Sequence, residues 1–281
     1  MSAIDRALLP RGAAAEAAAR AVAAYNAGDW PAAEGFCREA LAAQRDHVGA
    51  LNLLGAIAAQ SQRLEEAADL FGRAVAARPD NAAGHNNLGN VLQELGRHAL
   101  ALASYDRAIA LRPGYAAAHA NRSAALLALA RFDEAVAACE RALTLTPGDA
   151  ELQCRRATAL LALGRSADAV VACHRALVLQ PDDATAHLLL GNALCAEGRL
   201  REAEASLRQA LALDPAAPAA RAAYAECVSA LTVDRADPVV CATLARALDE
   251  AWIRPLNLAL AACSLVKLSL RARGLLGVAA A

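Results

Sequence analysis

Apolar residues recur at helical spacing in two neighbouring stretches between residues 82 and 115. Their positions are, in order, Leu88, Val91, Leu92 and Leu95, then Leu102, Tyr105 and Ile109. Gly96 lies between the stretches and can take the left-handed backbone conformation that ends a helix. Pro113 ends the second stretch, because proline lacks an amide hydrogen and disfavours helical geometry at the preceding residue. The pattern predicts two amphipathic helices joined by a turn at Gly96.

The same unit recurs every 34 residues along the chain. The period is marked by Pro79, Pro113, Pro147, Pro181 and Pro215. A small-residue site on the first helix holds Gly55, Gly89, Ser123, Ala157 and Gly191 in successive units. Two sites on the second helix are alanine throughout, namely Ala33, Ala67, Ala101, Ala135, Ala169 and Ala203, and Ala40, Ala74, Ala108, Ala142, Ala176 and Ala210. Helices approach closely where side chains are small, so a period of this length predicts stacked helix pairs.

A small residue at position 8, alanine at positions 20 and 27 and proline at position 32 of each unit resemble the tetratricopeptide repeat (TPR). The resemblance is to TPR repeats of bacterial type, similar to those in the TPR arm of O-linked N-acetylglucosamine transferase-like proteins. The resemblance implies an all-α fold, a right-handed α-solenoid of about six helix-turn-helix units with a capping helix and C-terminal helices.

The repeats divide the chain into three parts. Residues 1–13 are expected to form an N-terminal tail, residues 14–231 the solenoid, and residues 232–281 a C-terminal helical segment. The expected repeats are 14–47, 48–81, 82–115, 116–149, 150–183 and 184–217, followed by a capping helix at 218–231. In the C-terminal segment we expect one helix from Asp237 to about Trp252 and another from about Pro255 to Leu270.

The C-terminal segment differs from the repeats in charge. From Ala251 onward it has no acidic residue and four basic ones, Arg254, Lys267, Arg271 and Arg273. Its apolar run from Leu256 to Val266 is shorter than the roughly 20 residues that span a bilayer. Three interpretations remain open, namely docking on the last repeat, lying on a membrane surface, or packing against a partner protein or a downstream catalytic domain.

Composition limits the classes of partner and the cellular compartment that we expect for this protein. Charged residues make up 20% of the chain and the net charge is −1, which favours neither nucleic acid nor an anionic membrane as partner. The N-terminal residues include Asp5 and Arg6 and lack the apolar core of a secretory signal. Cys37, Cys139 and Cys173 share one repeat position that is predicted to be buried, and no CxxC pair is present. We therefore expect free thiols and a cytoplasmic protein.

The first helix of each pair lines the concave groove in TPR proteins, and this resemblance indicates which side chains face a ligand. The predicted peptide-binding residues are Asn52, Asn86, Asn87, Asn90, Gln93, Asn121, Arg155 and Asn192. Each asparagine has a donor and an acceptor, so a row of them can pair with the backbone of an extended peptide. Asn87 and Asn121 resemble two rungs of the asparagine ladder in O-linked N-acetylglucosamine transferases. Arg155 can hold a carboxylate in two hydrogen bonds, although polar residues on this face are also what solvation alone requires.

Two further sets of residues have both a structural and a functional interpretation. Arg122 and Arg156 occupy a position that is usually buried, so either their stems pack while their heads reach water or a carboxylate such as Glu151, or they form a cationic pocket beside Arg155. His85, His119 and His187 share one repeat position. Equivalent residues of packed helices lie roughly 8–10 Å apart, too far for a shared zinc ion, so we expect no metal or cofactor.

The chain contains no GxGxxG, P-loop, GxSxG or HExxH motif, so we do not expect an enzyme. The first hypothesis is a non-catalytic protein-protein interaction scaffold that binds an extended peptide or protein segment. The alternative is the substrate-recruiting arm of a methyl-, sulfo- or glycosyltransferase whose catalytic domain follows residue 281.

Overall fold

The computed structural model describes residues 12–230, which form helices and no strands. The first helices of successive pairs are α2 (Ala13–Asn26), α4 (Val48–Gln60), α6 (Ala82–Glu94), α8 (Ala116–Ala128), α10 (Ala150–Ala162), α12 (Ala184–Ala196) and α14 (Pro218–Ala230). The second helices are α3 (Trp30–Ala43), α5 (Leu64–Ala77), α7 (His98–Leu111), α9 (Phe132–Leu145), α11 (Ser166–Leu179) and α13 (Leu200–Leu213). The prediction of an all-α helical repeat is confirmed.

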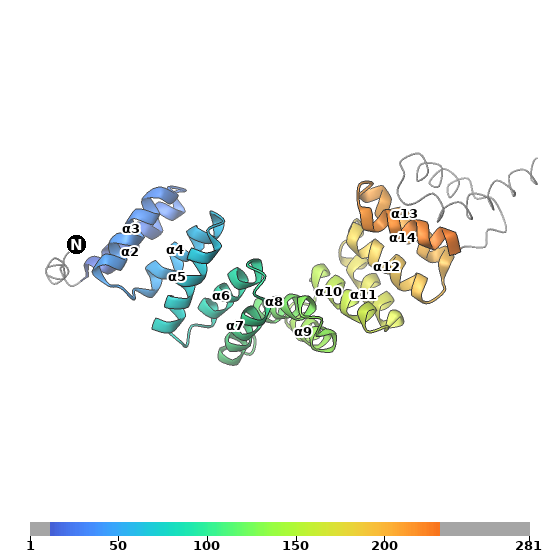
Figure 1. Cartoon of the computed structure of the whole chain (residues 1–281), viewed down its shortest axis with the longest axis horizontal. Helices are drawn as coiled ribbons and strands as arrows, with labels where there is room; N and C mark the ends of the chain where they lie inside the picture. The colour runs from blue at the N-terminus through green and yellow to red at the C-terminus, as the bar shows by residue number, and fades with distance from the viewer. Residues whose placement is uncertain (1–11, 231–281) are drawn as a thin grey trace, which may run out of the picture. The chain divides into compact units, whose positions relative to one another are not determined.

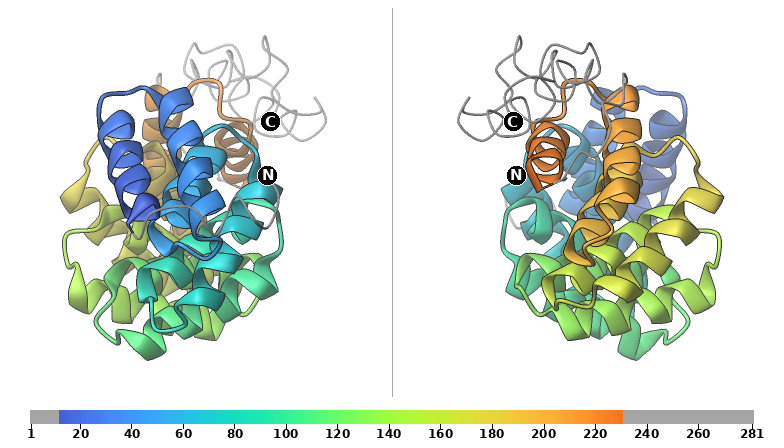
Figure 2. Two further views of the ribbon diagram at one scale, coloured as in Figure 1. Left: turned by 90° about the vertical axis from the view of Figure 1, so that its left-hand side faces the viewer. Right: turned by 90° about the vertical axis from the view of Figure 1, so that its right-hand side faces the viewer.

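The chain divides into two compact units, residues 1–145 and residues 146–281. The described helices α2 to α9 belong to the first unit and α10 to α14 to the second. Within each unit a second helix contacts the first helix of its own pair and that of the next pair, as α7 contacts α6 and α8 (Figure 1). The blue helices α2 and α3 show this pairing from a second direction, side by side in the left view of Figure 2.

Left-handed residues form the turns between paired helices. Gly28, Gly96, Gly164 and Gly198 have φ angles of 80°, 70°, 71° and 73°, as the turn prediction requires. In the two intervening repeats the same turn is made by Gln62 at φ 58° and Ala130 at φ 55°. A side chain in this conformation costs roughly 1 kcal/mol, so the helix pairing imposes the turn even where glycine is absent.

The small residues of the repeat allow the paired helices to approach closely. A Cβ atom added at Gly89 would lie 2.5 Å from Tyr105 Cε1, and one added at Gly191 would lie 2.4 Å from Leu207 Cγ. The two alanine sites of the second helices are completely buried, with an exposed fraction of 0% in all six repeats. The predicted register of the small positions is therefore confirmed.

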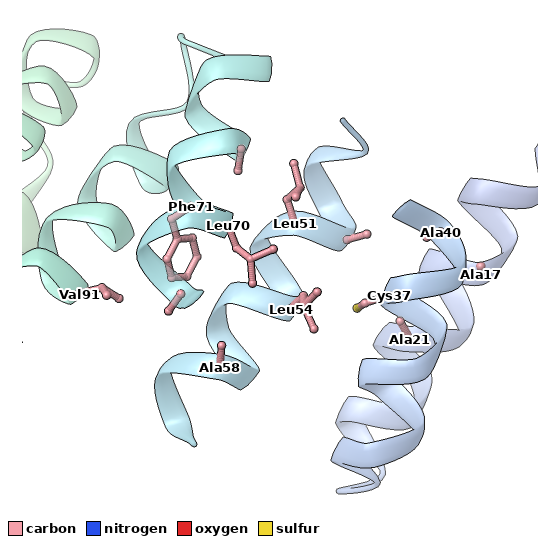
Figure 3. Packing of buried hydrophobic residues seen from close by; sticks show 13 residues of the cluster. Ala17, Ala21, Cys37, Ala40, Leu51, Leu54, Ala58, Leu70, Phe71 and Val91 are labelled. Carbon is pink, nitrogen blue, oxygen red and sulfur yellow. The ribbon is translucent and has the colours of Figure 1, made fainter. Parts of the chain in front are cut away.

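The core of the first unit runs continuously from one helix pair to the next. Cys37 of α3, Leu54 of α4, Phe71 of α5 and Val91 of α6 belong to one buried cluster (Figure 3). Burial raises the pKa of the Cys37 thiol to about 11, so the side chain behaves as a small apolar group. Cys139 and Cys173 are also completely buried, which confirms the predicted burial of this position.

Several predictions concern residues outside the described range. These are the N-terminal tail as far as residue 11, the helix from Asp237 to Trp252, the helix from Pro255 to Leu270 and the three interpretations of the C-terminal segment. Among the helices that the structure describes, none is both long enough and apolar enough to cross a membrane.

An ion pair joins α3 to Arg63, the residue that precedes α5. The Arg63 guanidinium donates to Glu34 Oε1 at 3.0 Å and to Glu34 Oε2 at 3.2 Å, and Arg38 pairs with the same carboxylate. The hydrogen bond from Arg63 is the largest cause that lowers the pKa of Glu34, and the positive charge of Arg38 contributes. The Glu34 carboxylate therefore stabilises the folded state in its ionised form.

We expect the Glu34→Gln variant to be less stable than the wild type at neutral pH by up to about 1 kcal/mol, a melting temperature lower by roughly 2–4 °C. Because the pKa is lowered in the folded state, this contribution is complete above the ordinary value of 4.5 and disappears as the pH falls through the lowered value. Melting curves from pH 7 to pH 3 should therefore converge at acid pH. Glu39→Gln, which removes an exposed carboxylate from the same helix, serves as control, and a constant gap at every pH would contradict this explanation.

Candidate functional site

The first helices of neighbouring pairs contact one another and carry the predicted binding residues. In the first unit α2 contacts α4 and α6 contacts α8, and in the second unit α12 contacts α10 and α14. The predicted residues of the first unit are Asn52, Asn86, Asn87, Asn90, Gln93 and Asn121, and those of the second are Arg155 and Asn192. Each unit therefore presents its own set.

Three of the predicted asparagines form one hydrogen-bonded group, the amide cluster Asn86, Asn90 and Asn121. Asn121 Nδ2 donates to Asn86 Oδ1 at 3.1 Å and to Asn90 Oδ1 at 2.8 Å. The Tyr105 hydroxyl also donates to Asn90 Oδ1, at 3.0 Å. The cluster thus links α6 to α8 and to α7, and part of its hydrogen-bonding capacity is used inside the protein.

Part of the hydrogen-bonding capacity of these residues is not used within the described part of the chain. Asn87 is half-buried and makes no hydrogen bond within the described part of the chain. Asn90 Nδ2 and Asn121 Oδ1 have no partner among the described residues, and both side chains are partly exposed. Asn86 is only 5% exposed and accepts a hydrogen bond from Asn121, so it supports the cluster. The free groups are a complete amide, one donor and one acceptor on adjacent helices.

Asn52 and Gln93 each have an amide oxygen that is buried without a partner among the described residues. Asn52 Nδ2 donates to the Val48 carbonyl at 2.9 Å, which leaves only its oxygen unsatisfied. An unsatisfied buried acceptor costs roughly 1–3 kcal/mol, so both side chains gain free energy if a new donor reaches them.

A groove of about 1480 Å³ lies in the second unit between the loops that lead into α10 and α12. It is lined by residues 146–151 and 179–185 together with Cys154, Arg155, Thr158 and Leu189. We name it the α10–α12 groove. Of the predicted site residues Arg155 lies in its wall, whereas Asn192 does not.

Acidic side chains outnumber basic ones in this groove. The groove is lined by four acidic residues, namely Asp149, Glu151, Asp182 and Asp183. Its lining has one cation, Arg155, which is ion-paired with Glu151. Two of the carboxylates also cap the N-termini of α10 and α12. Asp149 Oδ1 accepts the Leu152 amide at 3.0 Å, and Asp183 Oδ1 accepts the amides of Thr185 and Ala186 at 2.8 and 3.2 Å. A ligand carboxylate would therefore have to compete with Glu151 for Arg155, which the sequence prediction of a carboxylate site did not include.

The three equivalent histidines have a structural role in the repeat. Each places Nε2 within hydrogen-bond distance of the carbonyl oxygen of the repeat proline six residues earlier. The pairs are His85 with Pro79 at 3.1 Å, His119 with Pro113 at 2.9 Å and His187 with Pro181 at 3.0 Å. In the last pair Arg221 Nε donates to the Pro215 carbonyl at 2.8 Å from the same position. These bonds tie each first helix to the preceding loop and account for the spacing of the histidines.

For Arg122 the structure agrees with the interpretation that its stem packs while its head reaches a carboxylate. Its Nε donates to Asp106 Oδ1 at 2.6 Å, and its Nη2 lies 3.8 Å from Glu134 Oε2. The side chain is 23% exposed, so the stem packs while the head meets a carboxylate. The partner is Asp106 on the preceding second helix, which the sequence pattern did not reveal because the two residues meet only when the pairs stack.

Comparisons with known proteins agree with this architecture. A family model described as "Tetratricopeptide repeat" matches residues 86–150, 154–218 and 188–228, and one described as "TPR repeat" matches residues 55–96. Together these matches cover more than half of the chain. A comparison with curated proteins gives no match.

Several solved structures resemble the chain in fold. PilW, a type IV pilus biogenesis factor, is 21% identical with a TM-score of 0.62, over 76% of this chain and 99% of its own. PilF of Pseudomonas aeruginosa is 18% identical with a TM-score of 0.62, over 75% and 96%. YrrB, described as a TPR protein with an unusual peptide-binding site, is 17% identical with a TM-score of 0.59, over 66% and 96%. With the family matches and the helix pairs, these findings place the chain in the tetratricopeptide repeat family.

Proposed function

We propose that the protein is a non-catalytic interaction scaffold of the cytoplasm that binds an extended peptide or protein segment along its first helices. The observation that carries this proposal is the unused hydrogen-bonding capacity of Asn87, Asn90 and Asn121 on the adjacent helices α6 and α8. The amide cluster holds two of these side chains in fixed positions, so little conformational entropy is lost when a ligand binds them.

An extended peptide backbone matches these groups chemically. It offers alternating amide donors and carbonyl acceptors whatever its sequence, and an asparagine side chain provides one of each. Asn90 Nδ2 can donate to a peptide carbonyl, while Asn121 Oδ1 can accept a peptide amide. The peptide-binding description of YrrB, a structural neighbour, agrees with this class of ligand.

The unsatisfied oxygens of Asn52 and Gln93 support the same proposal. Each can gain a donor if the side chain rotates toward a bound segment. Asn192 lies on α12 and belongs to the separate set of predicted residues in the second unit.

Replacing Asn87 by alanine should weaken peptide binding about fivefold, which corresponds to roughly 1 kcal/mol for the lost hydrogen bonds. Asn87 is preferred to Asn121, because alanine at 121 would also remove the donor to Asn86 Oδ1 and one of the two donors to Asn90 Oδ1. The measurement is the affinity of the strongest binder from an array of random 12-residue peptides, by fluorescence anisotropy.

Asn81→Ala provides the matched control, because Asn81 precedes α6 and is not on the predicted binding positions. Equal affinities for the wild type and both variants would mean that the asparagines only solvate the surface, and the proposal would fail for this face.

A further inference from the structure

We infer that the α10–α12 groove binds a basic stretch of the ligand and selects a lysine or arginine side chain. This inference rests on the proposed function, since it specifies the kind of peptide that the second unit binds. From the sequence alone, Arg155 predicts an acidic ligand group, whereas this inference gives a basic one.

The charges around the groove give the first argument. Four carboxylates and one guanidinium line it, and the guanidinium is already paired with Glu151. A ligand carboxylate would have to displace Glu151 from Arg155 while facing the remaining acids. A ligand cation meets no such competitor and is attracted by the excess negative charge.

The carboxylates also differ in how far they are already satisfied. Asp182 is exposed and makes no hydrogen bond or ion pair within the described chain. Asp183 uses Oδ1 to cap α12, but among the described residues its Oδ2 accepts only the thiol of Cys154, at 3.6 Å. A thiol is a weak donor, so an ammonium or guanidinium group would be a stronger partner for this oxygen. Burial and the neighbouring Asp183 raise the pKa of the Cys154 thiol to about 12, in keeping with a negative potential here.

The apolar part of the lining suits the same type of side chain. Pro147, Leu179, Pro181 and Leu189 lie in the wall beside the acids. Lysine and arginine have long aliphatic stems that pack on apolar surface while the charged head reaches polar partners. The volume of about 1480 Å³ accommodates such a side chain together with its neighbours in an extended segment.

The test uses the full chain and three fluorescein-labelled libraries of 12-residue peptides. The libraries are identical except for the central pair, which is Lys-Arg, Asn-Gln or Asp-Glu. We expect the Lys-Arg library to bind most tightly at low salt and to lose its advantage at high salt. In Asp182→Asn/Asp183→Asn, affinity for the best Lys-Arg peptide should fall about tenfold, while affinity for the best Asn-Gln peptide should stay within about twofold.

The two substitutions keep the shape of the groove, and asparagine at 183 remains a good helix cap. An unchanged melting temperature of the double variant checks this point. Asp80→Asn is the matched control, because Asp80 occupies the repeat position of Asp182 in the first unit and is absent from the groove. It should leave the affinity for the Lys-Arg peptide unchanged.

The outcomes separate this inference from the proposed function. Equal or tighter binding of the Asp-Glu or Asn-Gln library, or a Lys-Arg affinity that ignores the double substitution, overturns the basic-ligand inference. The proposed function still stands if that binding is weakened by Asn87→Ala. A lack of binding by all three libraries overturns both.

Discussion

Replacing Gly89 by valine is expected to lower the free energy of unfolding by about 2–3 kcal/mol. Even the first carbon of the new side chain would lie 2.5 Å from Tyr105 Cε1. The ring cannot move aside easily, because Tyr105 is 1% exposed and its hydroxyl is bonded to Asn90. The substitution therefore forces α6 and α7 apart or displaces the ring from the amide cluster.

Gly72→Val is the matched control for this effect. Gly72 is also helical, but apart from its chain neighbours and the nearby backbone of its own helix no atom lies within 4 Å of a Cβ added there. The same change should therefore alter stability by only about 0.5 kcal/mol. Thermal melting followed by circular dichroism compares the two variants. Equal melting temperatures would show that the close approach at Gly89 does not limit packing.

The Ala108→Leu variant should lose about 1–3 kcal/mol of stability through overpacking. Ala108 lies on α7 with an exposed fraction of 0%, at a position that is alanine in all six repeats. Three additional heavy atoms do not fit there without moving a neighbouring helix or adopting an unfavourable rotamer.

The same substitution at Ala110 isolates the effect of packing. Ala110 is exposed on the same helix, and alanine and leucine have similar helix propensities, so Ala110→Leu should be nearly neutral. Urea denaturation of both variants measures the difference. An Ala108→Leu protein as stable as the wild type would contradict the assigned register of the second helices.

The positions of glycine do not by themselves predict every turn of the repeat. Gly96 predicted its turn correctly, whereas Gln62 and Ala130 make the equivalent turn without a glycine signal. At these two positions the packing of the helices on either side outweighs the local preference of the residue. The 34-residue period, rather than the residue at the turn, indicates where these two turns lie.

In the candidate site too, the sequence predicted which residues share a face but not which of them contact one another. The repeat register identified Asn86, Asn90 and Asn121 as belonging to one face, but it did not predict that Asn121 would bond to both of the others. Those bonds join residues 35 and 31 positions apart in the chain. The sequence interpretation of Arg155 as a carboxylate ligand likewise omitted the acids that the loop before α12 brings to its groove.

By itself the sequence determined the helix pairs, their period and the buried small positions, because these follow from local helical periodicity and from one spacing repeated many times. Only the tertiary structure decided which polar groups remain available. Stacking brings side chains of successive pairs within hydrogen-bond distance, and a donor or acceptor that finds a partner there is no longer free for a ligand. We therefore propose as binding groups the amides of the first unit and, in the second, Asp182 and Asp183, because these keep hydrogen-bonding capacity that the described part of the chain does not use.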